Sequence, residues 1–268
     1  MRSARSGRSR LTAVTALATL VALQAPVTAA GSPTGDASPG RPCTGSRVPE
    51  GGWARDVLGI AERARAEMDL KSVILRVTVV GREVITTALG ESMTGVPADP
   101  AMHFRNGSVA ISCMGTALLK LVDQGKARLD DPVARWLPDL KDGERITLRM
   151  LAASTTGLVD YVKAPGFAGS VSADPFRQWT AKELMAISTS RQRLYEPGTN
   201  WSYSHADFVL LGAALEKITG TRLDVLLQRE VLRPLGLLET RKSFTPDIPA
   251  PVLHAFTADR RTYEESTF

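Results

Sequence analysis

Cysteine and histidine are scarce in this sequence, and the motifs of several large enzyme classes are missing from it. The 268 residues include two cysteines and three histidines, the latter at positions 103, 205 and 254. Two cysteines are too few for a small disulfide-stapled fold, and such widely spaced histidines do not indicate a zinc site. The chain has no G-x-G-x-x-G, G-x-x-x-x-G-K-[ST], H-E-x-x-H, C-x-x-C or G-x-S-x-G segment. These absences argue against dinucleotide, P-loop, zincin, thiol-redox and α/β-hydrolase sites.

An excess of charge of one sign is also absent once the first 30 residues are set aside. The whole chain carries a net charge of +5, from 33 basic and 28 acidic residues. Residues 1–30 hold four arginines and no acidic residue, so 29 basic and 28 acidic residues remain in the rest. This balance predicts no nucleic-acid partner. The chain is 43% hydrophobic and long enough for a folded domain with a substantial core.

The first 30 residues have the organisation of a secretory signal peptide. Arginines precede an apolar run, Leu11–Leu23, and small residues at Val27 and Ala29 suit cleavage after Ala29 or Ala30. The run of 13 residues is too short to span a hydrocarbon core about 30 Å thick, and no longer run follows it. We therefore expect a signal peptide over residues 1–30, a secreted or cell-envelope location, and no transmembrane segment in the mature chain.

Residues 31–52 are rich in Gly, Ser and Pro and predict a flexible linker before a domain over residues 53–268. Cys43 lies in this linker, and Cys113 lies in an apolar helical run. An oxidising exterior would permit a disulfide between them. The alternative, which we favour, is two separate thiols with Cys113 as a small core residue.

Hydrophobic periodicity predicts several helices and one β-hairpin in the domain. Apolar residues recur at helical spacing over residues 57–70, and two β-branched runs, 72–80 and 84–89, predict a hairpin. Residues 108–124 are apolar on nearly all sides, which predicts a buried central helix. Shorter helices are predicted over residues 146–153, 181–188, 206–219 and 223–232.

Two stretches carry a more specific pattern than periodicity. The first runs from Phe104-Arg105-Asn106-Gly107-Ser108-Val109 to Leu129-Asp130-Asp131-Pro132-Val133. The second runs from Glu196-Pro197-Gly198-Thr199 through Trp201-Ser202-Tyr203-Ser204-His205 to the segment ending at Gly220. In order and spacing, they resemble the β-lactamase-related serine hydrolases, which include class C β-lactamases, D-Ala-D-Ala carboxypeptidases and related esterases. The resemblance covers residues 57–240.

This resemblance implies an α+β fold of the serine β-lactamase and penicillin-binding-protein type, with a helical domain on an antiparallel sheet. By matching position, Ser108 is the nucleophile and Tyr203 is the phenol that shares its proton. A serine at the start of a helix also presents its backbone N–H to an oxyanion. The alternatives are that Ser108 is only a helix N-cap and that Tyr203 is a half-buried loop aromatic.

The sequence departs from the family pattern at several positions. Ile111 occupies the place of the lysine in Ser-x-x-Lys, and Lys120 lies more than three helical turns from Ser108. His205 replaces the asparagine of Tyr-x-Asn, either as a structural hydrogen-bonding residue or as a general base. A Lys-Thr-Gly or His-x-Gly strand is missing, and the chain ends at Phe268. We therefore expect a fold that is incomplete at its C-terminus, as in a truncated member or a fragment of a longer product.

The resemblance predicts an exported serine hydrolase that cleaves an ester, amide or lactam through an acyl-serine intermediate, with Ser108, Tyr203 and His205 at the site. Its substrate would be a small molecule or peptidoglycan-like, and no metal or organic cofactor is implied. The alternative is a catalytically impaired penicillin-binding-like protein that binds but does not turn over its ligand. Ile111 and the missing third motif favour this alternative, whereas Ser108 and Tyr203 favour the enzyme.

Overall fold

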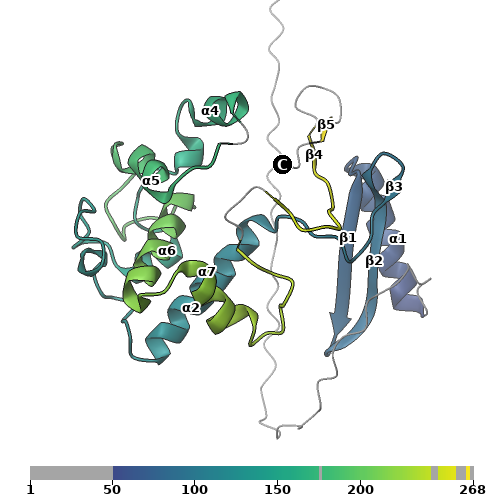
Figure 1. The fold of residues 1–268 in the computed structure, drawn as a ribbon, viewed down its shortest axis with the longest axis horizontal. Helices are drawn as coiled ribbons and strands as arrows, with labels where there is room; N and C mark the ends of the chain where they lie inside the picture. Colours follow the sequence, from purple (N-terminus) through teal and green to yellow (C-terminus); the bar gives the residue numbers. More distant parts are fainter. Residues whose placement is uncertain (1–50, 175–176, 243–246, 258–263, 266–268) are drawn as a thin grey trace, which may run out of the picture. The chain divides into compact units, whose positions relative to one another are not determined.

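The computed structural model describes residues 51–174, 177–242, 247–257 and 264–265. The predicted signal peptide, Cys43 and nearly all of the predicted linker lie outside these residues. The described part combines helices with antiparallel strands, which confirms the predicted α+β class (Figure 1). None of its helices is both long and apolar enough to cross a bilayer.

A helix and a hairpin form the N-terminal elements. Helix α1 (Gly52–Glu67) packs against strands β1 (Ser72–Val79) and β2 (Arg82–Met93), which pair antiparallel. The hairpin was predicted from its β-branched runs, and it turns through Val80 and Gly81, both at positive φ. The short strand β3 (Val96–Pro97) adds to β2. The helix begins one residue before the predicted domain boundary.

The rest of the described chain is mainly helical. The α-helices are α2 (Ala110–Asp123), α3 (Leu148–Ala153), α4 (Phe167–Ala173), α5 (Ala181–Thr189), α6 (His205–Thr219) and α7 (Leu223–Leu227). The 3-10 turns are η1 (Gly107–Val109), η2 (Val133–Arg135) and η3 (Tyr161–Lys163). The predicted helix 223–232 is not a single α-helix, because α7 continues as a π-helical turn, η4 (Gln228–Leu232).

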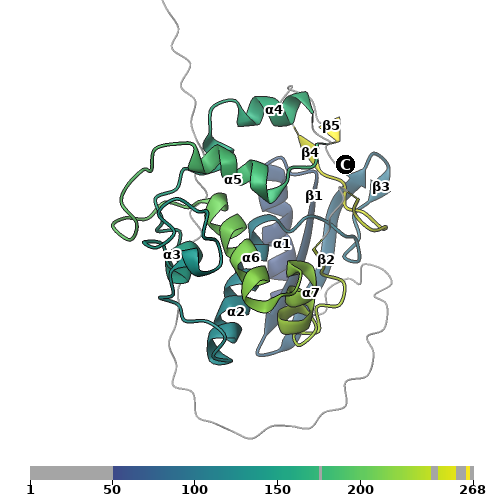
Figure 2. The same cartoon turned by 60° about the vertical axis from the view of Figure 1, so that its left-hand side comes forward.

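Helix α6 organises the hydrophobic core. It packs against α2, α3, α5 and α7, which surround it in Figure 2. Leu211 and Leu215 of α6 are fully buried with Leu121 of α2, Leu151 of α3 and Leu226 of α7. Each buried leucine contributes about 1.5–3 kcal/mol. The core therefore fixes the N-termini of α2 and α6, where the candidate site residues lie.

The prediction that helix 108–124 is buried on nearly all sides is wrong. Its beginning is the turn η1, and the buried residues of α2 are Ala117, Leu118 and Leu121. Val109 is 66% exposed and Leu119 is 52% exposed. The reason is that α6, α7 and η4 cover one face of α2.

The C-terminal part of the described chain returns to the end of the hairpin. Ser92 Oγ, on β2, donates a hydrogen bond of 2.7 Å to the Val252 carbonyl and accepts one of 3.1 Å from the His254 amide. His103 forms an isolated parallel bridge with Val252. The strands β4 (Phe256–Thr257) and β5 (Glu264–Glu265) pair antiparallel beyond it.

Candidate active site

Ser108 lies in the turn η1 that leads into α2. The residue before it, Gly107, has a φ of +56°, a conformation that glycine adopts at little cost. The capping positions are Asn106 for η1 and Val109 for α2, so Ser108 is not the N-cap of either element. Its side chain is exposed, and its amide belongs to the first turn, where backbone N–H groups lack acceptors within the helix.

Tyr203 reaches Ser108 from the loop before α6. Its hydroxyl donates a hydrogen bond of 3.0 Å to Ser108 Oγ. Backbone hydrogen bonds hold this loop, from the Ser202 amide to the Ser154 carbonyl and from the Gly198 amide to the Thr155 carbonyl. The structure therefore brings together the two side chains that the sequence patterns selected from different segments.

His205 is the first residue of α6 and lies beside Tyr203. The two ring centroids are 5.0 Å apart in an edge-to-face arrangement. His205 Nδ1 lies 2.9 Å from Asp160 Oδ2. Asp160 is 3% exposed, and its other oxygen accepts a hydrogen bond of 3.2 Å from the Val162 amide. A carboxylate on Nδ1 favours the tautomer with the proton on Nδ1, which leaves Nε2 as an acceptor.

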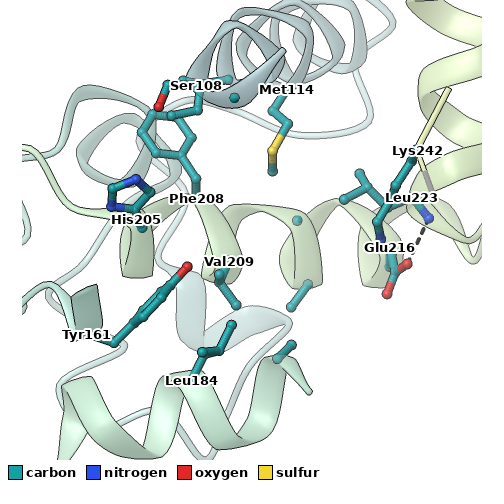
Figure 3. A pocket seen from close by; sticks show the side chains of 15 residues that line it. Ser108, Met114, Tyr161, Leu184, His205, Phe208, Val209, Glu216, Leu223 and Lys242 are labelled. Carbon is teal, nitrogen blue, oxygen red and sulfur yellow. Dashed lines mark hydrogen bonds between the residues drawn. The ribbon is translucent and has the colours of Figure 1, made fainter. Parts of the chain in front are cut away.

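Ser108 and His205 border a cavity of about 520 Å³ between α2, α5 and α6. Ser108 and His205 lie toward one end of it, and Glu216, Leu223 and Lys242 lie toward the other (Figure 3). Most of its remaining wall is apolar, formed by Ile111, Met114, Ala181, Leu184, Phe208, Val209, Gly212 and Ala213. Ile111, in the position of the family's lysine, therefore faces the same space as Ser108.

Asp160 and Tyr161 were not selected from the sequence. Tyr161 lines the cavity, and its ring centroid is 6.0 Å from that of His205. Burial, followed by the negative charge of Asp160 and the neighbouring Tyr203 phenol, raises the pKa of the Tyr161 phenol. The available signal was their place in the loop after α3, three and four residues beyond Gly157.

Asp207, on α6, forms a hydrogen bond with Thr156 in the loop that follows α3. It is fully buried, and its Oδ1 accepts a hydrogen bond of 2.6 Å from Thr156 Oγ1. Its Oδ2 has no hydrogen-bond partner among the residues that the structure describes. Burial raises the pKa of Asp207 to about 7, against the opposing effect of Thr156. Asp207 therefore adds a buried acidic group two residues beyond His205.

Within the part of the chain that the structure describes, neither a metal-binding cluster nor a cysteine pair contributes to this site. Among the described residues, no three His, Cys, Asp or Glu side chains gather in a metal-binding arrangement. Cys113 is a half-buried residue of α2 with no cysteine partner among the described residues, and Cys43 lies outside them.

Comparisons with known proteins agree with these motifs. The profile of the Beta-lactamase family matches residues 60–266. The chain is 30% identical over 207 residues to the esterase EstB of Burkholderia gladioli, covering 69% of this chain and 52% of EstB. It is 30% identical over 161 residues to a putative D-alanyl-D-alanine carboxypeptidase of Escherichia coli, covering 53% of this chain and 36% of that protein.

A solved structure gives the same result at the level of the fold. A D-stereospecific amidohydrolase from a Streptomyces species superposes with a TM-score of 0.60 at 30% identity, covering 70% of this chain and 57% of that one. The chain thus spans 36–57% of the length of these three relatives.

Proposed function

The chain belongs to the beta-lactamase family of serine hydrolases, and we propose that it hydrolyses an ester, amide or lactam through an acyl intermediate on Ser108. The observation that carries this proposal is the hydrogen bond of 3.0 Å between the Tyr203 hydroxyl and Ser108 Oγ at the edge of an apolar cavity. A serine becomes nucleophilic when a neighbouring group accepts its proton. Tyr203 and His205 would accept that proton and deliver it to the leaving group.

The reaction would proceed in two stages. In the first, Ser108 Oγ attacks the substrate carbonyl, its proton moves to the Tyr203–His205 pair, and the leaving group departs with a proton. In the second, water attacks the acyl-serine, and the same groups remove and return a proton. The Ser108 amide, in the first turn before α2, would donate a hydrogen bond to the oxyanion.

The wall of the cavity favours a substrate with an apolar acyl group. Ile111, Met114, Leu184 and Val209 offer hydrocarbon surface in the cavity that Ser108 borders. Burying such an acyl chain contributes about 0.8 kcal/mol per CH₂. Ester or amide substrates agree with the names of the esterase and amidohydrolase relatives, and the carboxypeptidase relative leaves a peptidoglycan-like amide as a further substrate class.

We also propose that the chain is exported and that a linker precedes its hydrolase domain. The pattern of residues 1–30 supports export of the chain to the cell envelope or the exterior. Residues 31–52 would then link the cleavage site to the hydrolase domain that occupies residues 53–268.

A second candidate function is binding without turnover. The observation in its favour is Ile111, whose hydrocarbon side chain faces the cavity where the family has a lysine amine. In that case, the cavity would hold an acyl or peptidoglycan-like ligand while Ser108 remained unreactive.

A turnover assay separates these functions. The wild-type protein and Ser108→Ala are given 4-nitrophenyl esters, a D-Ala-D-Ala peptide and a chromogenic cephalosporin. We expect hydrolysis of at least one class by the wild type and its loss in Ser108→Ala. Absence of turnover, with saturable ligand binding that is equal in both proteins, would favour the binding function.

A further inference from the structure

We propose that Asp160 and His205 form the acid–base dyad of this site, with Asp160 positioning the imidazole that accepts the Ser108 proton. This inference rests on the proposed serine hydrolase function and adds to it a residue that the sequence motifs did not select. The dyad supplies a base to a site in which Ile111, a hydrocarbon side chain that cannot accept a proton, occupies the position of the family's lysine.

The first observation is that the buried Asp160 carboxylate is held by two hydrogen bonds. It is nearly completely buried, with one oxygen on the Val162 amide and the other 2.9 Å from His205 Nδ1. A buried carboxylate is costly unless hydrogen bonds satisfy it. The amide bond fixes the carboxylate in the turn η3, so the carboxylate in turn fixes the orientation and the tautomer of the imidazole.

The second observation is where the rest of the imidazole lies. The His205 side chain is 36% exposed, and it lines the cavity that Ser108 also borders (Figure 3). With Nδ1 bonded to Asp160, Nε2 is the ring atom that remains for a proton from the reaction. The Tyr203 ring packs edge-to-face against the imidazole, with the ring centroids 5.0 Å apart, and its hydroxyl donates a hydrogen bond to Ser108 Oγ.

The third observation is the set of groups around the imidazole. The ionisable neighbours are Asp160, Tyr161 of η3 and Tyr203 of its own loop. The sides of the cavity formed by α2 and α5 are apolar, whereas Glu216 and Lys242 lie at its other end (Figure 3). Asp207, two residues along α6, bonds Thr156 instead. Asp160 is thus the charged group bonded directly to the ring.

The proton balance of the proposed step is complete within these residues and the substrate. As the bond between Ser108 Oγ and the carbonyl carbon forms, the Tyr203 hydroxyl, which donates to Ser108 in the resting site, turns toward His205 Nε2, gives its proton to that nitrogen and takes the serine proton in its place. The imidazolium returns this proton to the leaving oxygen or nitrogen as the bond between it and the carbonyl carbon breaks. Water then repeats the sequence on the acyl-serine, while Asp160 stays ionised and stabilises the imidazolium.

The test uses two variants that keep their hydrogen-bonding shape. Asp160→Asn retains the acceptor for the Val162 amide but presents an N–H to His205 Nδ1, which moves the ring proton to Nε2. His205→Asn retains a donor toward Asp160 but removes the base. The rate of Ser108 modification by a fluorophosphonate is measured from pH 5 to 9, with thermal melts as a check on folding.

For the wild type, we expect the rate to rise with pH across the neutral range, where imidazoles lose their proton. Both variants should react about 10²–10⁴-fold more slowly, and His205→Asn should lose the neutral inflection. Wild-type modification at Ser108 with unchanged rates and pH profile in Asp160→Asn would overturn the dyad but leave the hydrolase function standing. Failure of the wild type to react at Ser108 would overturn both.

A second measurement examines the dyad without using activity. Nitrogen-15 NMR of the imidazole rings distinguishes the Nδ1–H and Nε2–H tautomers, and His205→Asn identifies the His205 signals among those of three histidines. We expect Nδ1–H at alkaline pH in the wild type and Nε2–H in Asp160→Asn. The same tautomer in both proteins would contradict the positioning role of Asp160.

Discussion

The Tyr203 hydroxyl donates a hydrogen bond of 3.0 Å to Ser108 Oγ, although the two residues are separated by 95 positions in the sequence. One residue precedes α6 and the other precedes α2, and these helices pack against each other. The packing of the two helices therefore sets the distance between the phenol and the serine. The chemistry of the site depends on this core contact as much as on the two side chains.

Replacing Tyr203 by phenylalanine removes the hydroxyl and retains the ring. We expect Tyr203→Phe to slow fluorophosphonate modification of Ser108 by about 10²-fold or more, because the proton path is broken. The free energy of unfolding should change by no more than about 1.5 kcal/mol, since one partly exposed hydrogen bond is lost. Modification rates and urea titrations measure the two effects separately. An unchanged modification rate would remove Tyr203 from the mechanism.

Restoring the family's lysine tests whether His205 has taken over its role. His205→Asn should be nearly inactive, because Ile111 still offers no base. The double variant His205→Asn/Ile111→Lys, which has both family residues, should regain about tenfold or more of the lost modification rate. The matched control is His205→Asn/Ile111→Met, which changes the same side chain without adding an amine. Equal rates in the two double variants would show that position 111 does not substitute for His205.

The raised pKa of Asp207 predicts a pH-dependent stability. The pKa of an aspartate is about 3.9 in model peptides and about 7 for folded Asp207, so the folded state favours the neutral carboxyl. The stability gained from this preference is full below pH 4 and is lost as pH rises through 7. A shift of three units corresponds to roughly 4 kcal/mol at most.

Asp207→Asn cannot ionise, so it should melt at a higher temperature than the wild type at pH 8. This advantage should shrink or reverse by pH 4 to 5, where the wild-type carboxyl is protonated. The exposed residue Asp139 provides the control, since Asp139→Asn should give a difference that does not depend on pH. A melting difference for Asp207→Asn that is constant between pH 4 and 8 would contradict the burial argument.

The cavity predicts a preference for longer acyl chains. If the chain lies along α5 and α6, each added CH₂ that becomes buried should raise kcat/KM by about fourfold until the cavity is filled. Ala213→Phe should then reduce activity on 4-nitrophenyl octanoate far more than on the acetate, because the larger ring fills the cavity. Leu184→Met, which conserves volume, serves as the control. Equal losses on both esters in Ala213→Phe would place the acyl chain elsewhere.

The elements that the sequence predicted well are those with local signals. The hairpin follows from β-branched runs around a glycine, and α5 and α6 follow from apolar spacing. The contact between the Tyr203 and His205 rings also follows from local sequence, because the two residues are separated by one position and alternate residues of an extended segment point to the same side. These features depend on residues close together in the chain.

The features that the sequence did not predict depend on distant partners. Asp160 meets His205 across 45 positions, and Asp207 meets Thr156 across 51. Neither pair produces a local sequence pattern. In the sequence, Asp160 therefore looks like an ordinary loop residue and Asp207 like an ordinary helix residue, although both carboxylates are buried. The exposure of Leu119 on α2 has the same origin, since periodicity shows that a helix is apolar but not which faces its neighbours cover.

Peptide mapping after fluorophosphonate treatment tests directly whether Ser108 is the nucleophile. We expect a single phosphonyl adduct on the peptide containing Ser108 and none in Ser108→Ala. An adduct on another residue, or equal labelling of the wild type and Ser108→Ala, would contradict this assignment.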